Sequence, residues 1–198
     1  MSAQLKSAVI LAGLNSYGTT TIIENEKSRD HTENILKLIS NAIKIKKNKK
    51  KFILIEGKKT LNPLNIKVPG DPSSAAFFVA LTLLKENSLL KINNVGLNPT
   101  RTGFYRILKK GGASISFIKM KKENNENVGN ILVRSSKLKP LKVSKKYYVN
   151  STDEYPILFV IAGLTKGVST FNGISDLVKK ESNRIKEMQK ILRQDGIK

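Results

Sequence analysis

Apolar and polar positions repeat in the same order along three segments of the chain, residues 6–57, 73–136 and 153–198. Each segment begins with an apolar stretch of helix length, passes a turn, and continues as a short strand. A loop and a second, amphipathic helix follow in each segment. The pattern therefore predicts an α/β protein built from one repeated unit. The strands after the turns are expected at Thr19–Ile23, Leu89–Ile92 and Val168–Phe171.

The first two segments end in a pair of strands joined by a charged tip. The third segment reaches Lys198 where its own strand pair should begin, and the first starts its apolar helix only a few residues after Met1. By the logic of the repeat, we expect a fragment of a larger protein, incomplete at both ends. The strand pairs are expected at Ala42–Ile45 with Phe52–Ile55 and at Ser114–Ile118 with Ile131–Val133.

Two linkers separate the three segments. Leu61–Pro72 holds three prolines and Gly70, which disfavour a regular helix and indicate an extended crossing or hinge. Ser135–Asn150 carries a further proline among lysines. We therefore expect two domains, residues 1–68 and 69–198, that meet at the first linker.

Composition excludes several classes of protein. The longest apolar runs, Ala8–Leu14 and Ala75–Leu84, are shorter than the roughly 18–20 residues that a membrane-spanning helix needs. The chain has no cysteine and one histidine, so we expect no disulfide framework, no thiolate metal site and no histidine-based metal cluster. These features favour a reducing compartment, and we expect a cytoplasmic protein.

The net charge of +21, from 36 basic and 15 acidic residues, raises the question of a polyanionic partner. Only six of the basic residues are arginine, the side chain favoured for bidentate recognition of phosphates and bases. Nearly half of the lysines, 14 of 30, lie in Lys44–Lys51, Lys119–Lys122 and Lys137–Lys146, beside apolar strands. We interpret these runs as solvated hairpin tips and loops. A lysine-rich nucleic-acid-binding module remains as an alternative from another functional class.

Two groups of polar residues in the first segment could bind an anion. Ser2–Gln4 stand at the start of an apolar helix, where free backbone N–H groups attract negative charge, but these residues taken alone favour a simple N-cap at Ser2. Residues 28–33 lead into the second helix, and Glu33 can support its first turn. Arg29 could contact a phosphate or pair with an acidic neighbour on the surface.

The third segment carries carboxylates and cations in a pattern that could support proton transfer. Asp153 and Glu154 stand directly before an apolar helix, where acids also serve as partners of the helix dipole. Lys180 and Arg184 are spaced as i and i+4, which would place them on one helix face with Glu181 beside them. Such a group could hold an anionic substrate and move a proton, or it could be an ordinary salt-bridged first turn.

Six stretches of the chain follow the order found in one enzyme family: SAQLKSAVILAGL, SRDHTENIL, VPGDPSSAAFF, NPTRTGFYRIL, DEYPIL and KKESNRI. The chain resembles the 5-enolpyruvylshikimate-3-phosphate synthase family over essentially its whole length, and SRDHTE and DEYPIL are most similar to the glyphosate-tolerant bacterial subgroup. The resemblance implies an inside-out α/β barrel built from repeated βαβαββ-like units. Residues 1–68 would then be the last unit of the N-terminal lobe, and residues 69–198 the first, truncated part of the C-terminal lobe.

The resemblance also implies a reaction. The family transfers the enolpyruvyl group of phosphoenolpyruvate to the 5-hydroxyl of shikimate 3-phosphate and releases phosphate, on the shikimate pathway to chorismate and the aromatic amino acids. It implies no metal or organic cofactor, no membrane partner, and a monomeric full-length protein. By position, substrate contacts are implied at Ser2, Ala3, Gln4, Ser28, Arg29, Asp153, Lys180 and Arg184, with Asp153 also accepting the proton of the hydroxyl and Glu181 transferring a proton.

Two departures from the family pattern qualify this expectation. Asn183 stands where the family usually has aspartate, which removes an anionic partner for the neighbouring cations. Further basic residues of the family's site lie outside the chain, so we expect no turnover from these 198 residues alone. The related UDP-N-acetylglucosamine enolpyruvyl transferase shares the fold and the donor and is the alternative enzyme; SRDHTE and DEYPIL argue against it.

Overall fold

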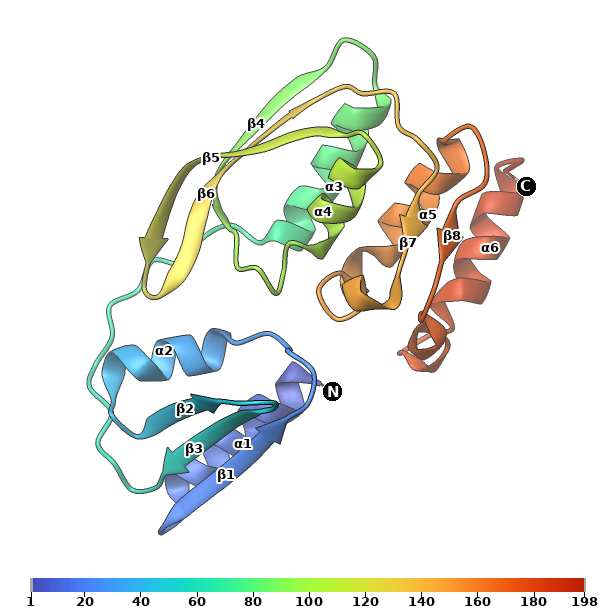
Figure 1. Ribbon diagram of the computed structural model, residues 1–198. Helices are drawn as coiled ribbons and strands as arrows, with labels where there is room; N and C mark the ends of the chain where they lie inside the picture. Colours follow the sequence, from blue (N-terminus) through green and yellow to red (C-terminus); the bar gives the residue numbers. More distant parts are fainter. Residues whose placement is uncertain (1, 198) are drawn as a thin grey trace. The chain divides into compact units, whose positions relative to one another are not determined.

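A computed structural model describes residues 2–197, which form two compact units (Figure 1). The first unit holds the chain up to Val68 and also residues 122–127, which are the tip of a hairpin. The second unit holds Pro69–Lys121 and the chain from Val128 onward. No described helix combines the length and the apolar character that a membrane crossing requires.

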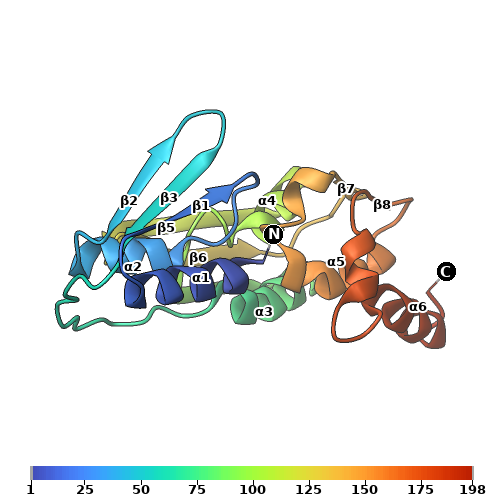
Figure 2. The same cartoon turned by 90° about the horizontal axis from the view of Figure 1, so that it is seen from below.

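The first unit is a three-stranded antiparallel sheet with two helices on one side of it (Figure 2). The strand order is β1-β3-β2, so β3 is the central strand. Ile53 and Ile55 alternate along β3 and therefore point to one face, where they pack with Ile10 and Leu14 of the first helix and Leu36 of the second. The elements are α1 (Ala3–Asn15), β1 (Thr19–Glu24), α2 (His31–Ile39), β2 (Ile43–Lys47) and β3 (Lys51–Glu56).

The second unit repeats this arrangement. Its first five elements follow the same order along the chain, and its sheet order, β4-β6-β5, corresponds strand for strand to that of the first unit. The repeat predicted from the apolar pattern is therefore confirmed for these two segments. The elements are α3 (Pro72–Leu84), β4 (Leu89–Gly96), α4 (Gly103–Lys110), β5 (Ser114–Glu123) and β6 (Glu126–Arg134).

The third segment contributes the helix, strand and helix that its pattern predicts. The second linker contributes a strand that the sequence did not indicate, since Lys142–Val143 form β7, which pairs in parallel with β8. A pairing only two residues long has no periodicity that a sequence could reveal. The remaining elements are α5 (Tyr155–Leu164), β8 (Thr170–Phe171), α6 (Arg184–Gln194) and the short 3₁₀ turns η1 (Lys145–Tyr147), η2 (Thr152–Glu154) and η3 (Ser175–Lys179).

An aromatic core holds the second unit together. Phe104 and Tyr105 on α4 and Tyr155 on α5 are almost fully buried. The hydroxyl of Tyr105 donates to the carbonyl oxygen of Pro72 over 2.5 Å, which ties α4 to the start of α3. Burial raises the pKa of Tyr155 to about 12, so its hydroxyl stays neutral at physiological pH. This core fixes the N-terminal ends of α3 and α5 relative to each other.

Two expectations about loops fare differently. Residues 59–69 contain neither helix nor strand, as the prolines of the first linker predict, while Pro72 already belongs to the first turn of α3. The lysine runs are only partly solvated tips. Lys119–Lys121 lie within β5, and the side chain of Lys51 is only 13% exposed because it enters an ion-pair cluster.

Candidate functional site

The start of α1 carries three of the residues implied in substrate binding. Ser2 is the N-cap of the helix, and its hydroxyl accepts a hydrogen bond from the backbone N–H of Leu5 over 3.4 Å. Ser2 and Gln4 are exposed and Ala3 is half-buried. The helix has no acidic residue in its first turn, so the positive end of its dipole is not offset by its own side chains. The cap predicted at Ser2 is confirmed, and the end of the helix suits an anion.

Ser28 and Arg29 lie on the loop between β1 and α2. Ser28 is 1% exposed, and both its hydroxyl and its backbone N–H donate to Oε1 of Glu24, over 2.6 and 3.0 Å. Arg29 is half-buried. The loop conformation is therefore set by Glu24, a residue that sequence reasoning did not single out.

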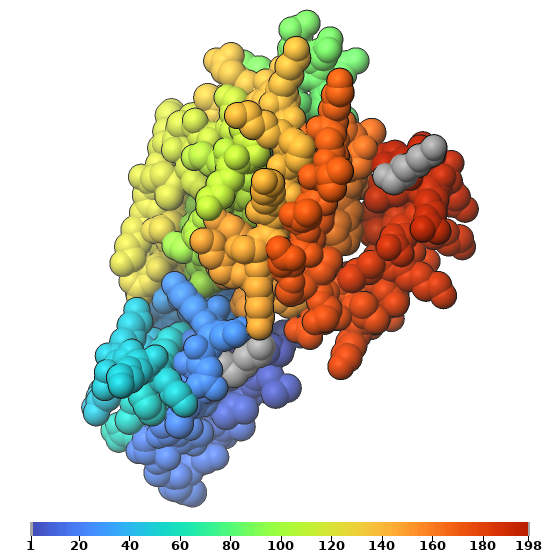
Figure 3. Space-filling view, turned by 45° about the vertical axis from the view of Figure 1, so that its right-hand side comes forward, coloured from blue at the N-terminus to red at the C-terminus, as the bar shows by residue number. Residues whose placement is uncertain are grey.

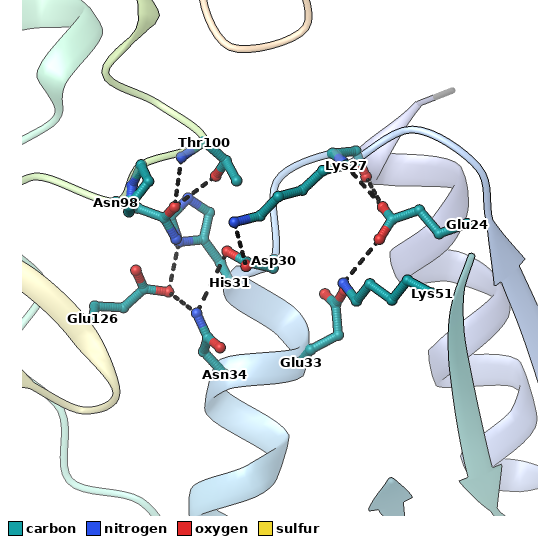
Figure 4. A network of polar contacts seen from close by, with 12 residues as sticks. Glu24, Lys27, Asp30, His31, Glu33, Asn34, Lys51, Asn98, Thr100 and Glu126 are labelled. Atoms are coloured by element: carbon teal, nitrogen blue, oxygen red, sulfur yellow. Dashed lines mark hydrogen bonds and ion pairs between the residues drawn. The ribbon is translucent and has the colours of Figure 1, made fainter. Parts of the chain in front are cut away.

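Four charged side chains form a buried group that we call the lysine–glutamate cluster: Lys6, Glu24, Glu33 and Lys51. Nζ of Lys6 lies 2.9 Å from Oε1 of Glu24 and 2.8 Å from Oε1 of Glu33. Nζ of Lys51 lies 2.8 Å from Oε2 of Glu24 and 2.9 Å from Oε1 of Glu33. The side chains of Lys6, Glu24 and Glu33 have no exposed area. Figure 4 shows Glu24, Glu33 and Lys51 converging from three different elements.

Glu33 lies in the first turn of α2, as predicted. Its side chain is also fully buried and turned to the two lysines, which the sequence did not indicate. The position that suits the helix start also faces the interior, and two buried cations attract a carboxylate far more strongly than an exposed helix end does.

The charges in the lysine–glutamate cluster stabilise one another in their ionised forms. Burial acts to raise the pKa of Glu24, but hydrogen bonds from Lys51, Ser28 and Lys6 outweigh it and lower the pKa to about 2. Burial acts to lower the pKa of Lys51, yet the two carboxylates raise it above its ordinary value. The cluster contains two lysines and two glutamates, so its formal charges cancel.

The second unit brings three of its four implied site residues together. Nη1 of Arg184 lies 3.8 Å from Oδ1 of Asp153, and Nη2 donates to Oε2 of Glu181 over 3.1 Å. Nη1 of Arg184 also donates to the carbonyl oxygen of Thr152 over 3.4 Å. One guanidinium thus connects both candidate catalytic carboxylates, which come from the turn before α5 and the loop before α6.

The predicted helical pairing of Lys180 with Arg184 is wrong, because α6 begins only at Arg184. Lys180 is exposed and has an extended backbone. Asn183 is the N-cap, and its side chain accepts from the backbone N–H of Lys186 over 3.1 Å. Since asparagine and aspartate both cap helices well, the departure from the family's aspartate preserves this start of the helix. A backbone hydrogen bond and the neighbouring Arg184 lower the pKa of Glu181, which is ionised at neutral pH.

A second network, also missed by sequence reasoning, supports the turn that carries Asp153. Glu154 is 3% exposed and accepts a short hydrogen bond from the hydroxyl of Ser73. Nη2 of Arg101 donates to Ser73 over 2.7 Å and to Asp71 over 2.6 Å. Asp71 is the N-cap of α3. Residues 71–74 therefore form a capped helix start, and Ser73 anchors Glu154, the residue next to Asp153.

Other features of the described residues add no reactive groups. Within residues 2–197 no three His, Asp or Glu side chains are grouped as ligands for a metal ion. A groove of about 440 Å³ lies between α5, β8 and α6, and its lining is mostly apolar. Figure 3 shows a hollow where α6, in red, meets the orange segments. Nδ1 of His31 lies 2.9 Å from Oε1 of Glu126 on the hairpin tip, and the side chain of His31 is partly exposed.

Comparisons with known proteins agree on one family. The family profile of EPSP synthase (3-phosphoshikimate 1-carboxyvinyltransferase) matches residues 1–198. A relative of this name from Zymomonas mobilis is 42% identical over 197 residues, which cover 99% of this chain and 44% of the relative. One from Petrotoga mobilis is 44% identical and is covered to 45%. The chain thus spans slightly less than half the length of these curated relatives.

Solved structures agree with the sequence comparisons. An EPSP synthase from Acinetobacter baumannii matches 98% of this chain and 43% of its own, with a TM-score of 0.86 and 36% identity. The enolpyruvyl transferase NikO from Streptomyces tendae matches 81% of this chain with a TM-score of 0.55 and 15% identity, which shows a common fold only. These likenesses confirm the predicted fold class, the α/β fold of the enolpyruvyl transferases built from repeated units.

Proposed function

Because the chain belongs to the EPSP synthase family, we propose that it forms part of an enzyme that transfers the enolpyruvyl group of phosphoenolpyruvate to the 5-hydroxyl of shikimate 3-phosphate. The observation that carries the proposal is the contact of Arg184 with both Asp153 and Glu181. A guanidinium between two carboxylates is suited to bind an anionic donor while the carboxylates handle protons on either side of it.

The candidate residues of the second unit take the chemical roles. Asp153 accepts the proton of the acceptor hydroxyl while the hydroxyl oxygen bonds to the central carbon of phosphoenolpyruvate. Glu181 delivers a proton to the methylene carbon and removes one when phosphate leaves, so that the enol ether is restored. Arg184 binds the donor anion, and Lys180, exposed on the same loop as Glu181, provides a further cation for the substrates.

The candidate residues of the first unit bind the acceptor, shikimate 3-phosphate. Shikimate 3-phosphate carries a phosphate and a carboxylate. The N-terminus of α1 at Ser2, Ala3 and Gln4, whose first turn holds no acidic residue, is suited to one of these groups. Arg29, a half-buried cation, is the next residue after the anchored Ser28. No metal is needed for this chemistry, since fixed cations and helix ends supply the positive charge.

The proposal extends to the setting of the enzyme. The relatives are named for a reaction of 3-phosphoshikimate, which supports a place on the shikimate pathway to the aromatic amino acids, and the lack of cysteine suits the cytoplasm. We further propose a monomer for the complete enzyme. The proposed domain assignment is residues 1–68 as the last unit of one lobe and residues 69–198 as the first part of the other.

The test is an assay of the longest open reading frame that contains these 198 residues, with the chain alone as a second sample. We expect the full reading frame to form enolpyruvylshikimate phosphate and the chain alone to show no turnover, because it spans less than half of its relatives. Offering UDP-N-acetylglucosamine as the acceptor separates the alternative enzyme, and turnover with that acceptor alone would contradict the proposal.

The role of Asp153 is tested by Asp153→Asn, with Asp195→Asn on the exposed end of α6 as the matched control. We expect kcat to fall by about 10²–10⁴-fold with little change in the KM for shikimate 3-phosphate, because a general base acts mainly in the transition state. An unchanged kcat in Asp153→Asn would remove Asp153 from the catalytic machinery.

A further inference from the structure

The lysine–glutamate cluster connects the two segments of the first unit that carry the proposed acceptor contacts. Lys6 lies on α1 within a turn of Ser2, and its backbone N–H donates to the carbonyl oxygen of Ser2 over 3.2 Å. Glu24 ends β1 and binds both the hydroxyl and the N–H of Ser28, next to Arg29. The start of α1 and the loop after β1 are thus joined through a single buried ion pair, Lys6 with Glu24.

Two further side chains complete this connection. Glu33, on α2, contacts the same Nζ of Lys6 and also Lys51. Lys51, at the start of β3, contacts both carboxylates. Four elements therefore meet at one neutral set of charges that excludes water from three of its four members.

If the lysine–glutamate cluster only held the four elements together, apolar side chains could do the same. Apolar side chains of similar volume commonly replace buried ion pairs without loss of stability, since the desolvation of each charge offsets its attraction to the partner. Hydrogen-bonded charges also fix the orientation of the groups that they contact, which apolar side chains do not. Here Glu24 fixes the orientation of Ser28, because it accepts hydrogen bonds from both the hydroxyl and the backbone N–H of that residue.

We propose that Lys6, Glu24, Glu33 and Lys51 are positioning residues that hold the first turn of α1 and the Ser28–Arg29 loop in the spacing required to bind the phosphate-bearing acceptor. This inference rests on the proposed function. The cluster touches no substrate. It sets the places of groups that do, so its disruption weakens acceptor binding and leaves the chemical step at Asp153 and Glu181 intact.

The experiment measures steady-state kinetics of the full-length enzyme in two variants. Glu24→Gln keeps the shape and an acceptor for Ser28 but removes one charge from the cluster. Lys6→Met with Glu33→Gln removes one cation and one anion, which keeps the site neutral but cuts the connection to α1. We expect each variant to raise the KM for shikimate 3-phosphate by about tenfold with kcat changed by less than about threefold, the signature of lost ground-state binding.

Matched controls come from the same unit. Glu26→Gln changes an exposed glutamate on the same loop, and Lys49→Met changes an exposed lysine at the hairpin tip. Both are expected to keep the KM of the wild type within about twofold. Because KM does not depend on the amount of active enzyme, a variant that is merely less stable loses maximal rate while its KM stays unchanged.

The outcomes separate the two proposals. A wild-type enzyme without activity toward shikimate 3-phosphate overturns the proposed function. An active wild type whose two variants keep a normal KM overturns the positioning role alone. Failure of the neutral double variant to fold also overturns that role, because it would show that the lysine–glutamate cluster is needed for the fold of the unit rather than for the spacing of its two segments.

Discussion

Replacing Lys6 by Met removes one of the two cations from the lysine–glutamate cluster and leaves Glu24 and Glu33 to share Lys51. The side chains of Lys6 and both carboxylates have no exposed area, so water cannot replace the lost ammonium without opening the core. Removing one partner of a buried ion pair costs about 3–5 kcal/mol in the free energy of unfolding. Two contacts, at 2.9 and 2.8 Å, are lost together, and we therefore expect a value toward the upper end of that range.

The loss should depend on pH in a direction that identifies its cause. In the wild type the pKa of Glu24 is lowered from 4.5 to about 2, so its contribution is present above about pH 4.5 and is lost as the pH falls toward 2. In Lys6→Met two carboxylates share one cation, and their repulsion raises the pKa of one of them above its ordinary value. A carboxyl with a raised pKa takes up a proton in the folded variant as the pH falls from neutrality, which stabilises the variant. The difference in free energy of unfolding between Lys6→Met and the wild type should therefore narrow toward pH 4.5.

The assay is urea-dependent hydrogen exchange followed by mass spectrometry, which reports the unfolding of the first unit from peptides within residues 2–56. Lys37→Met on the exposed side of α2 is the matched control, with an expected change within about 0.5 kcal/mol. Equal losses in both variants would refute the reasoning that burial sets the cost. A loss in Lys6→Met that is the same at pH 7 and pH 5 would refute the account based on unbalanced charge.

Three further predictions address the rest of the chain. Gly57→Ala should lower the free energy of unfolding by more than about 3 kcal/mol in thermal melts, because a Cβ there would lie 1.7 Å from the carbonyl oxygen of Ser16. Gly18→Ala should lower it by only about 1 kcal/mol, because Gly18 has φ +80° but open space around it. Arg184→Lys should raise the KM for phosphoenolpyruvate about tenfold, since lysine cannot reproduce the forked contacts of the guanidinium, and an unchanged KM would contradict the proposed donor contact. Between pH 4.5 and 2 the free energy of unfolding of the wild type should fall by about 3 kcal/mol, the amount that corresponds to the lowered pKa of Glu24, and Glu24→Gln should lack this fall. A fall of the same size in the variant would show that other groups cause it.

The repeat and its elements were accessible from the sequence because they depend on neighbouring residues. Apolar runs, turns and short β-branched strands recur in the same order, and the two sheets that they form have the same strand order. The helix cap at Ser2 and the irregular stretch after β3 also follow from local chemistry. The start of α6 did not, because Asn183 determines it, while the charges at Lys180 and Glu181 suggested an earlier first turn.

The polar networks were decided by tertiary structure. Lys6 and Glu24 are 18 residues apart, and Ser73 and Glu154 are 81 residues apart. In a sequence each of these side chains looks like one more surface charge or hydroxyl, in a chain with 36 basic residues and 15 acidic ones. Apolar periodicity predicts which face of a helix or strand is buried, but it does not predict which other element packs against that face.

The sequence by itself therefore determined the family, the repeated α/β fold and the residue types of the candidate site. Packing decided which of those residues stand together, as Arg184 does with Asp153, and which apparently ordinary charges became interior, as Glu33 did. The physical reason is that hydrophobic patterning is set along the chain, whereas an ion pair forms wherever two distant segments happen to be brought within a few ångströms and water is excluded.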